Sequence, residues 1–560
     1  MRRCAAYIRL YAPRDDQTNS AVPPTHPAVT VALCQGVVHP FSSGMGGGAF
    51  ILISMANGTS EVVDAREQAP AAATERMYVG KPEASLTGGT AIAVPGELQG
   101  LRLAWERYGR APWADNVLPV AALAESFVVS RENLQTNPDP RPQPYIALTP
   151  AHRPQPRAPR EPQVRGLDPR RQVDVELAAA IAHEADALRR FEASSRLFLP
   201  GDRPPAAGAT LANTALAATL RAVAARPDAL TRGEFATQLL AEIAAAGGSV
   251  TADDLARYAP VLRAPLRLDV GGVTLLGVPP PSSGGAAVLM ALLYLSLLPT
   301  PLATASDGLA AHLQVEALKQ AFAMRMSLGD PSFVPDVQQV LDAMLSPEFN
   351  HALAVNHSDV ATRPSSEYGG RYNRRGATLP PDGGTSHFSV IDAQRNAVAM
   401  TTTINSFFGS KVVSAATGIV FNNEMDDFST PGLSNSYGIA PSASNFIRPG
   451  KRPLSSMAPT IVLQARASHA RGTCAREHAR GTHEAYGHVV GKWWAHAHSM
   501  HMHITRGCAY TCHAHDVCAS LISMSYSMWH DVIYCRMCCA PTVRSHATCV
   551  PSRAPQAARA

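Results

Sequence analysis

A change in hydrophobic period near Asp382 restricts the possible folds of this chain more than any other feature of its sequence. Upstream of that point the apolar residues recur with helical spacing, whereas downstream they follow the period of extended strands. Residues 387–391 and 397–403 predict two strands, and the polar residues 392–396 between them predict a turn. The chain is therefore expected to leave a helical region and enter a β-hairpin here.

The pairing of this hairpin predicts which polar groups meet at its open end. If Ile391 pairs with Val398, the register sets Thr403 opposite Ser386 and Ile404 opposite Thr385. A hydroxyl group of the second strand is then expected close to the start of the first strand.

The region before the hairpin supplies most of the expected helices. Helical periodicity is found at residues 175–190, 211–225, 233–246 and 309–328, and residues 251–254 fit a capping box. The glycine-rich residues 44–48 lead into an apolar strand at 49–53, without the Gly-Lys-Ser/Thr ending of a phosphate loop. This run therefore favours close backbone packing over phosphate binding.

Composition and charge exclude some classes of function. The 560 residues include 49 Lys and Arg against 44 Asp and Glu, and no long basic run is present, so nucleic acid is not an expected partner. Residues 1–9 start with basic residues, but Arg9 interrupts the apolar stretch, so no signal peptide is evident. The apolar residues 290–298 are too few for a transmembrane helix. These features do not predict a compartment.

A processing site is one interpretation of Gly383, Gly384 and Thr385. Two glycines leave the backbone accessible and free to adopt strained angles, and a hydroxyl residue follows them at once. An ordinary turn is the alternative, because the same triplet occurs at residues 88–90 without any such implication.

Further blocks accompany this triplet in a defined order. After Thr385 the chain contains TIN at 403–405, NNEMDDF at 422–428 and PLSSMAPT at 453–460; before it lie GMGGGAF at 44–50, DARE at 64–67 and AVPGE at 93–97. Together they resemble the γ-glutamyltranspeptidases, from about Ala28 to about Gln464.

The resemblance implies an α+β fold, the four-layer αββα fold of the N-terminal-nucleophile hydrolases. It also implies a precursor that cleaves itself between Gly384 and Thr385. Residues 1–384 would form the large-subunit region, with a Pro/Arg-rich insertion at 137–171, and residues 385–464 the small-subunit region. A free N-terminal threonine suits the chemistry, because its own α-amine can act as the general base for its hydroxyl. Thr403 would orient that hydroxyl.

The implied substrates are glutathione and other γ-glutamyl compounds, with water, amino acids or dipeptides as acceptors and with no cofactor or metal. A γ-glutamyl head group carries an α-carboxylate and an α-ammonium, so it needs donors at one end and acceptors at the other. By resemblance, the carboxylate partners are Arg66, Ser455 and Ser456, and the ammonium partners are Asn405, Glu424 and Asp427. Each residue taken singly also fits a surface charge, a solvated loop or a helix cap.

Residues 465–560 form a His/Cys-rich tail that does not match the family, so an incomplete or altered C-terminal part of the fold is expected. The family's Gly-Gly pair, which supplies oxyanion donors, has no counterpart there. Cys508 and Cys512 have a spacing that zinc sites use, but the residues after them form no recognised finger, which favours a disordered tail or one from an altered reading of the coding region.

Two other functions remain open at this point. The chain could be an uncleaved, inactive relative that retains a γ-glutamyl-binding pocket. It could also be a related acylase for another acyl amide, although Arg66 and the acidic pair suit a free amino-acid head group better.

Overall fold

A computed structural model describes residues 25–125, 127–128, 175–368, 384–435 and 439–464 of the chain. The predicted insertion at 137–171 and the tail at 465–560 lie outside these described residues.

The predicted hairpin forms one end of a larger sheet, whose strand order is β5-β2-β1-β9-β8. Its strands are β1 (Gly48–Ser54), β2 (Ser60–Ala65), β5 (Val261–Arg263), β8 (Thr385–Ile391) and β9 (Ala397–Thr403). All neighbouring strands in this sheet are antiparallel. Strand β9 therefore joins the hairpin to a strand that lies more than 300 residues earlier in the chain.

The predicted register of the hairpin was wrong by one residue, because Thr403 lies opposite Thr385 and not opposite the residue after it. The turn explains the difference. The amide of Asp392 donates to the carbonyl of Asn396 over 3.0 Å, and Arg395 has a φ of 73°. A three-residue loop that ends in a left-handed residue is a common hairpin connection, and it is one residue shorter than the pairing we expected. The two threonines therefore face each other directly.

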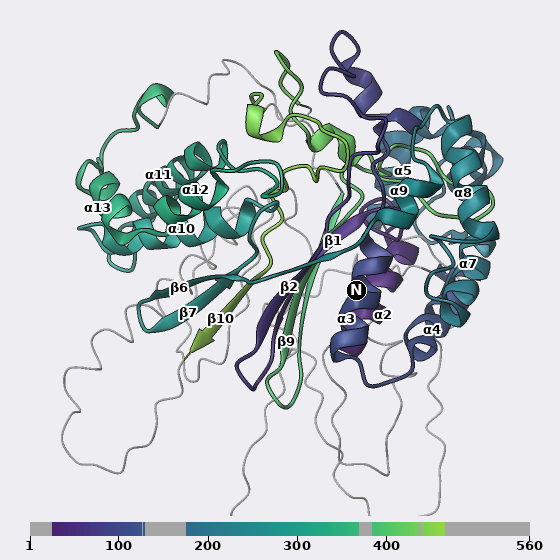
Figure 1. Cartoon of the computed structure of the whole chain (residues 1–560), viewed down its shortest axis with the longest axis horizontal. Coiled ribbons are helices and arrows are strands. Elements are labelled where there is room, and N and C mark those ends of the chain that lie inside the picture. Colours follow the sequence, from purple (N-terminus) through teal and green to yellow (C-terminus); the bar gives the residue numbers. More distant parts are fainter. Residues whose placement is uncertain (1–24, 126, 129–174, 369–383, 436–438, 465–560) are drawn as a thin grey trace, which may run out of the picture.

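A smaller sheet lies against the larger one (Figure 1) and has the strand order β10-β7-β6. Its strands are β6 (Leu266–Val270), β7 (Val273–Gly277) and β10 (Thr460–Gln464); β3 (Phe127–Val128) and β4 (Thr210–Leu211) form a separate short ladder. Phe50 and Leu52 of the larger sheet share one buried cluster with Leu276 and Ile461 of the smaller sheet. Apolar side chains thus fill the space between the two sheets.

Helices cover the outer face of each sheet (Figure 1). The helices on the side of the larger sheet are α2 (Thr25–Val38), α3 (Glu97–Tyr108), α4 (Trp113–Glu125), α5 (Val175–Leu188), α6 (Glu192–Phe198), α7 (Thr214–Ala225), α8 (Glu234–Ala245) and α9 (Ala252–Arg257). The helices on the side of the smaller sheet are α10 (Gly284–Leu297), α11 (Asp307–Arg325), α12 (Val337–Leu345) and α13 (Pro347–Val355). Short 3-10 helices are η1 (Pro82–Ser85), η2 (Gly89–Ala91), η3 (Pro200–Asp202), η4 (Ser365–Tyr368), η5 (Glu424–Asp427) and η6 (Ala443–Asn445).

The described part of the chain thus has the predicted order of layers, which is helix, sheet, sheet, helix. Helices α5, α7, α8 and α11 confirm the four periodic segments, and Thr251 and Asp254 form the expected capping box at the start of α9. Among the described residues, no helix combines the length and the apolar character that a membrane span requires.

The glycine run at 44–48 is a close-packing element, as its sequence predicted. A Cβ atom on Gly47 would lie 1.9 Å from the carbonyl oxygen of Thr403, and one on Gly46 would lie 2.0 Å from that of Val420. These distances are far below van der Waals contact, so only glycine lets this segment approach the end of β9.

We expect Gly47→Ala to lower the free energy of unfolding by at least about 1–3 kcal/mol, because the added methyl group must push β9 away. Gly308→Ala is the matched control, since a Cβ there meets no atom within 4 Å and the residue lies in the first turn of α11. Urea unfolding followed by circular dichroism measures both changes. Equal stabilities of the two variants would contradict the packing role of Gly47.

Candidate active site

The hairpin brings the hydroxyl groups of two threonines together at the start of β8. The Oγ1 atoms of Thr385 and Thr403 are 2.9 Å apart, and both side chains are buried. Thr403 Oγ1 donates to the carbonyl oxygen of Gly384 over 2.9 Å and accepts the amide hydrogen of Asn405, also over 2.9 Å. A hydroxyl group has a single hydrogen, so this donation leaves Thr403 to accept from Thr385. The Thr403 hydroxyl therefore lies between the Thr385 hydroxyl and the carbonyl of the preceding peptide bond.

The peptide bond before Thr385 is held against a neighbouring loop. A Cβ atom on Gly384 would lie 2.3 Å from the carbonyl oxygen of Phe41 and 2.8 Å from the Cα of Ser42. The hydroxyl of Ser42 also contacts that of Ser386 over 2.9 Å. The contact with Phe41 and Ser42 explains why glycine occupies position 384, because any side chain there would displace the carbonyl that Thr403 contacts.

Asn405 connects β9 to the acidic residues of η5. Its φ of 72° turns the chain away from the strand, and its Nδ2 donates to the carbonyl of Asn423 over 3.1 Å. Asn422, which our sequence reasoning did not assign to the site, donates from Nδ2 to the carbonyl oxygens of Gly46 and Ala93, over 2.6 and 3.0 Å. Its only sequence signal was its place in the block at 422–428.

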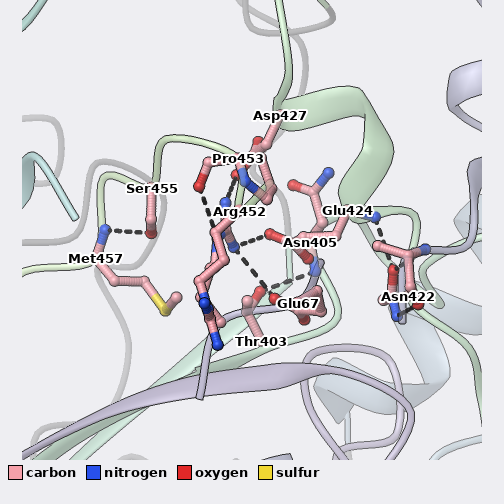
Figure 2. Close-up of polar contacts among 12 residues, drawn as sticks. Glu67, Thr403, Asn405, Asn422, Glu424, Asp427, Arg452, Pro453, Ser455 and Met457 are labelled. Atoms are coloured by element: carbon pink, nitrogen blue, oxygen red, sulfur yellow. Dashed lines mark hydrogen bonds and ion pairs between the residues drawn. The ribbon is translucent and has the colours of Figure 1, made fainter. Parts of the chain in front are cut away.

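A buried arginine, Arg66, binds the acidic residues Glu424 and Asp427, which Figure 2 shows beside Asn405 and Thr403. The Nη1 of Arg66 donates to Glu424, and its Nη2 donates to Asp427. Its Nε donates to the carbonyl oxygen of Pro453 over 3.2 Å. Arg66 follows β2 and its acidic partners lie in η5, so the fold joins residues that are about 360 positions apart. Arg66, Glu424 and Asp427 were all predicted site residues.

Burial and mutual attraction set the charges in this cluster. Burial alone would lower the pKa of Arg66, but the nearby Glu424 and Asp427 carboxylates outweigh it and raise that pKa above its ordinary value. Burial raises the pKa of Glu424 well above its usual range, although the attraction of Arg66 opposes the shift. Arg66 is therefore a permanent cation, whereas Glu424 is an acid that holds its proton unusually well. Among the described residues, no group of His, Cys, Asp and Glu is arranged to hold a metal ion.

The two predicted serines follow the carbonyl that Arg66 contacts. Ser455 Oγ accepts the amide hydrogen of Met457 over 3.1 Å, as Figure 2 shows, whereas Ser456 Oγ accepts from Nη2 of Arg325 over 2.9 Å. Arg325 also donates from Nε to the hydroxyl of Ser283 over 2.9 Å. Arg325, at the end of α11, was missed because it belongs to none of the recognised blocks and only the folded chain brings it here.

Comparison with known proteins identifies the family of this chain. The model of the Gamma-glutamyltranspeptidase family matches residues 25–140 and 171–473. The chain belongs to this family. Over 441 residues it is 41% identical to Glutathione hydrolase 2 of Arabidopsis thaliana, a match that spans 78% of this chain and 68% of the relative. The match to Glutathione hydrolase 3 of the same plant has 35% identity and covers 78% of this chain but 61% of that relative.

Solved structures agree on the fold. Cephalosporin acylase from Bacillus halodurans superposes with a TM-score of 0.60 at 22% identity, over 79% of this chain and 71% of that protein. The γ-glutamyltranspeptidase of Helicobacter pylori superposes with a TM-score of 0.50 at 24% identity, over 61% of this chain and 87% of that protein. The predicted family and the N-terminal-nucleophile hydrolase fold are thus confirmed, and the family is one of enzymes.

We expect Arg66→Ala to destabilise this protein by about 3–5 kcal/mol, because the buried Glu424 and the partly buried Asp427 lose their cation. Arg196→Ala is the control, since Arg196 pairs with Glu192 on the surface, where both side chains are more than 70% exposed, and should leave stability unchanged. Urea unfolding near pH 7 compares the two. A loss for Arg66→Ala no larger than that for the control would show that the buried cluster does not stabilise the fold.

Proposed function

We propose that this chain is an autoprocessing γ-glutamyl hydrolase and transferase. It cleaves itself between Gly384 and Thr385 into the large-subunit region 1–384 and a small subunit that begins at Thr385. It then cleaves the γ-glutamyl amide of glutathione and its conjugates. The observation that carries the proposal is the position of the Thr403 hydroxyl between the Thr385 hydroxyl and the Gly384 carbonyl.

Processing uses the same hydroxyl that later acts on substrate. Thr385 Oγ1 attacks the carbonyl carbon of Gly384, and Thr403 hydrogen-bonds to the carbonyl oxygen as negative charge develops on it. The Thr385 hydroxyl loses its proton, the amide nitrogen of Thr385 leaves as an amine after gaining a proton, and an ester joins Gly384 to Thr385. Water then hydrolyses the ester, which releases the carboxylate of Gly384 and the α-amine of Thr385.

The new α-amine makes the threonine a nucleophile near neutral pH. An α-amine has a pKa of about 7.7–8.0, so a substantial fraction is unprotonated and can take the proton of the Thr385 hydroxyl. That hydroxyl attacks the γ-carbonyl of the donor, and the protonated amine returns its proton to the leaving nitrogen. Thr403, fixed by the amide of Asn405, orients the hydroxyl throughout.

The charged cluster suits the head group of the donor. Arg66 pairs directly with Glu424 and Asp427. A γ-glutamyl head group carries one charge of each sign, so it can take over these pairs without leaving a buried charge unmatched. Its α-carboxylate would bind Arg66, Ser455 and Ser456. Its α-ammonium would bind Glu424, Asp427 and Asn405.

The acyl group leaves the enzyme by transfer to water, to an amino acid or to a dipeptide. Acyl transfer neither consumes nor produces electrons, so the reaction needs no redox cofactor. Several relatives are named as proenzymes, which supports an enzyme over an uncleaved, inactive relative.

We expect purified wild-type protein to separate into two chains under denaturing conditions, with a mass break between Gly384 and Thr385, and Thr385→Ala to stay intact. Thr403→Ala should cleave about a hundredfold more slowly, because the scissile carbonyl loses its hydrogen-bond donor. Thr403→Ser keeps a hydroxyl and is the matched control, with cleavage close to the wild-type rate. Intact mass measured over time gives these rates.

Folded wild-type protein that stays a single chain would contradict the proposal. If wild-type protein does cleave, equal cleavage rates for Thr403→Ala and Thr403→Ser would remove the role assigned to the Thr403 hydroxyl.

A further inference from the structure

Glu67 is a buried acid next to the charged cluster, and the reaction described above does not use it. It directly follows Arg66 after β2, and its residue is 0% exposed. Neither oxygen of its carboxylate has a side-chain hydrogen-bond partner among the described residues. A buried carboxylate with so few partners is costly, so its presence requires a reason.

The nearest cation to this carboxylate is Arg66, whose Nη1 lies 3.6 Å from Oε2 of Glu67. That distance is too long for a hydrogen bond, and Nη1 donates instead to Glu424. A guanidinium group has five N–H donors, and its partners in the described structure are Glu424, Asp427 and the carbonyl of Pro453. Arg66 is thus held by Glu424 and Asp427, the same two acids that we propose bind the α-ammonium of the donor.

The position of Glu67 is fixed from the other side by β1. A Cβ atom on Gly48 would lie 2.5 Å from Oε2 of Glu67, so the carboxylate packs directly against this glycine. Gly48 pairs with Thr403 across the sheet. Glu67 therefore lies between Arg66 and the start of β1, where Gly48 pairs with Thr403.

We propose that Glu67 is a positioning residue for donor binding, whose carboxylate holds the Arg66 guanidinium in place when Glu424 and Asp427 turn from it to the substrate ammonium. The inference rests on the proposed function, since it assumes a head group with both charges. Glu67 itself does not touch the donor. It acts by keeping Arg66 aimed at the donor carboxylate.

Charged and titratable groups from several elements surround Glu67. They are Asp64 and Arg66 at β2, Glu97 in α3, Tyr258 after α9, and Glu424 and Asp427 in η5. Burial, partly offset by Arg66, raises the pKa of Glu67 from 4.5 to about 7. The carboxylate is therefore neutral in the folded protein at pH 5.5 and ionised at pH 8.

The pKa shift has a defined sign for stability. Between pH 4.5 and about pH 7 the folded protein keeps a proton on Glu67 that the unfolded chain has released. The contribution of this residue to stability is therefore greatest at low pH and falls as the pH rises through 7. A neutral glutamine avoids this loss, so Glu67→Gln should be at least as stable as wild type near pH 8.

The test is calorimetric binding of L-glutamate, which carries the same α-carboxylate and α-ammonium and undergoes no turnover. In wild type the affinity should rise between pH 5.5 and pH 8, because both Glu67 and Glu424 lose their protons more fully as the pH rises. Glu67→Gln should bind about tenfold more weakly than wild type near pH 8, where Glu67 is ionised, and this difference should shrink at pH 5.5, where Glu67 is neutral. Glu61→Gln is the matched control, because Glu61 lies on the same β2 but pairs with Arg107 away from the site.

Thermal unfolding near pH 8 separates positioning from a structural role. The proposal expects Glu67→Gln to melt at or above the wild-type temperature while it binds glutamate more weakly. A lower melting temperature with unchanged glutamate affinity would overturn it and make Glu67 structural. A stable variant that binds glutamate as tightly as wild type at both pH values would overturn it as well.

The same measurements distinguish this inference from the proposed function. Wild-type protein that binds glutamate but cleaves no γ-glutamyl anilide would refute the enzyme activity, and the comparison with Glu67→Gln would still decide the role of Glu67. Wild-type protein that binds no glutamate would overturn the inference, because Arg66 would then have no donor carboxylate to meet.

Discussion

Backbone hydrogen bonds hold strand β9 on both of its edges, with β1 on one side and β8 on the other. Because the strands pair residue by residue, this double pairing fixes Gly48 and Thr385 on opposite sides of the same Thr403. The position of one hydroxyl group then follows from the register of two ladders, each built from seven paired residues. A shift of one residue in either ladder would turn Thr403 to the other face of the sheet and separate it from its partners.

The second constraint on the site is electrostatic. Burying an isolated charge is costly, so Arg66 and its acidic partners are stable only as a set. The loop at 422–428 can hold its acids there because Asn422 ties it to the backbone of Gly46 and Ala93. The charged cluster and the threonine pair are therefore fixed to the same glycine-rich edge of β1, although they belong to distant parts of the sequence.

Local patterns in the sequence predicted much of the fold, whereas contacts between distant segments were predicted only through the family resemblance. The bounds of β9 were predicted correctly because its apolar residues and flanking turn are local signals. The register of the β8–β9 hairpin was predicted wrongly, because it depends on a left-handed conformation of Arg395. The residue type gives no reason to expect that conformation. Helix α10 was not predicted, because it is buried on nearly every side and shows no amphipathic period. In the site, the pairing of Arg66 with η5 and the contact of Arg325 with Ser456 both depend on tertiary packing.

Both sheets mix strands from the two sides of the Gly384–Thr385 bond. In the larger sheet β8 and β9 follow this bond while β1, β2 and β5 precede it, and in the smaller sheet β10 pairs with β7 across the same divide. If the bond is cut, neither fragment keeps a complete sheet or a closed apolar core of its own. The resulting pair would be an obligate heterodimer whose interface is the former interior, so dilution alone should not separate its chains, and losing one would mean unfolding the other.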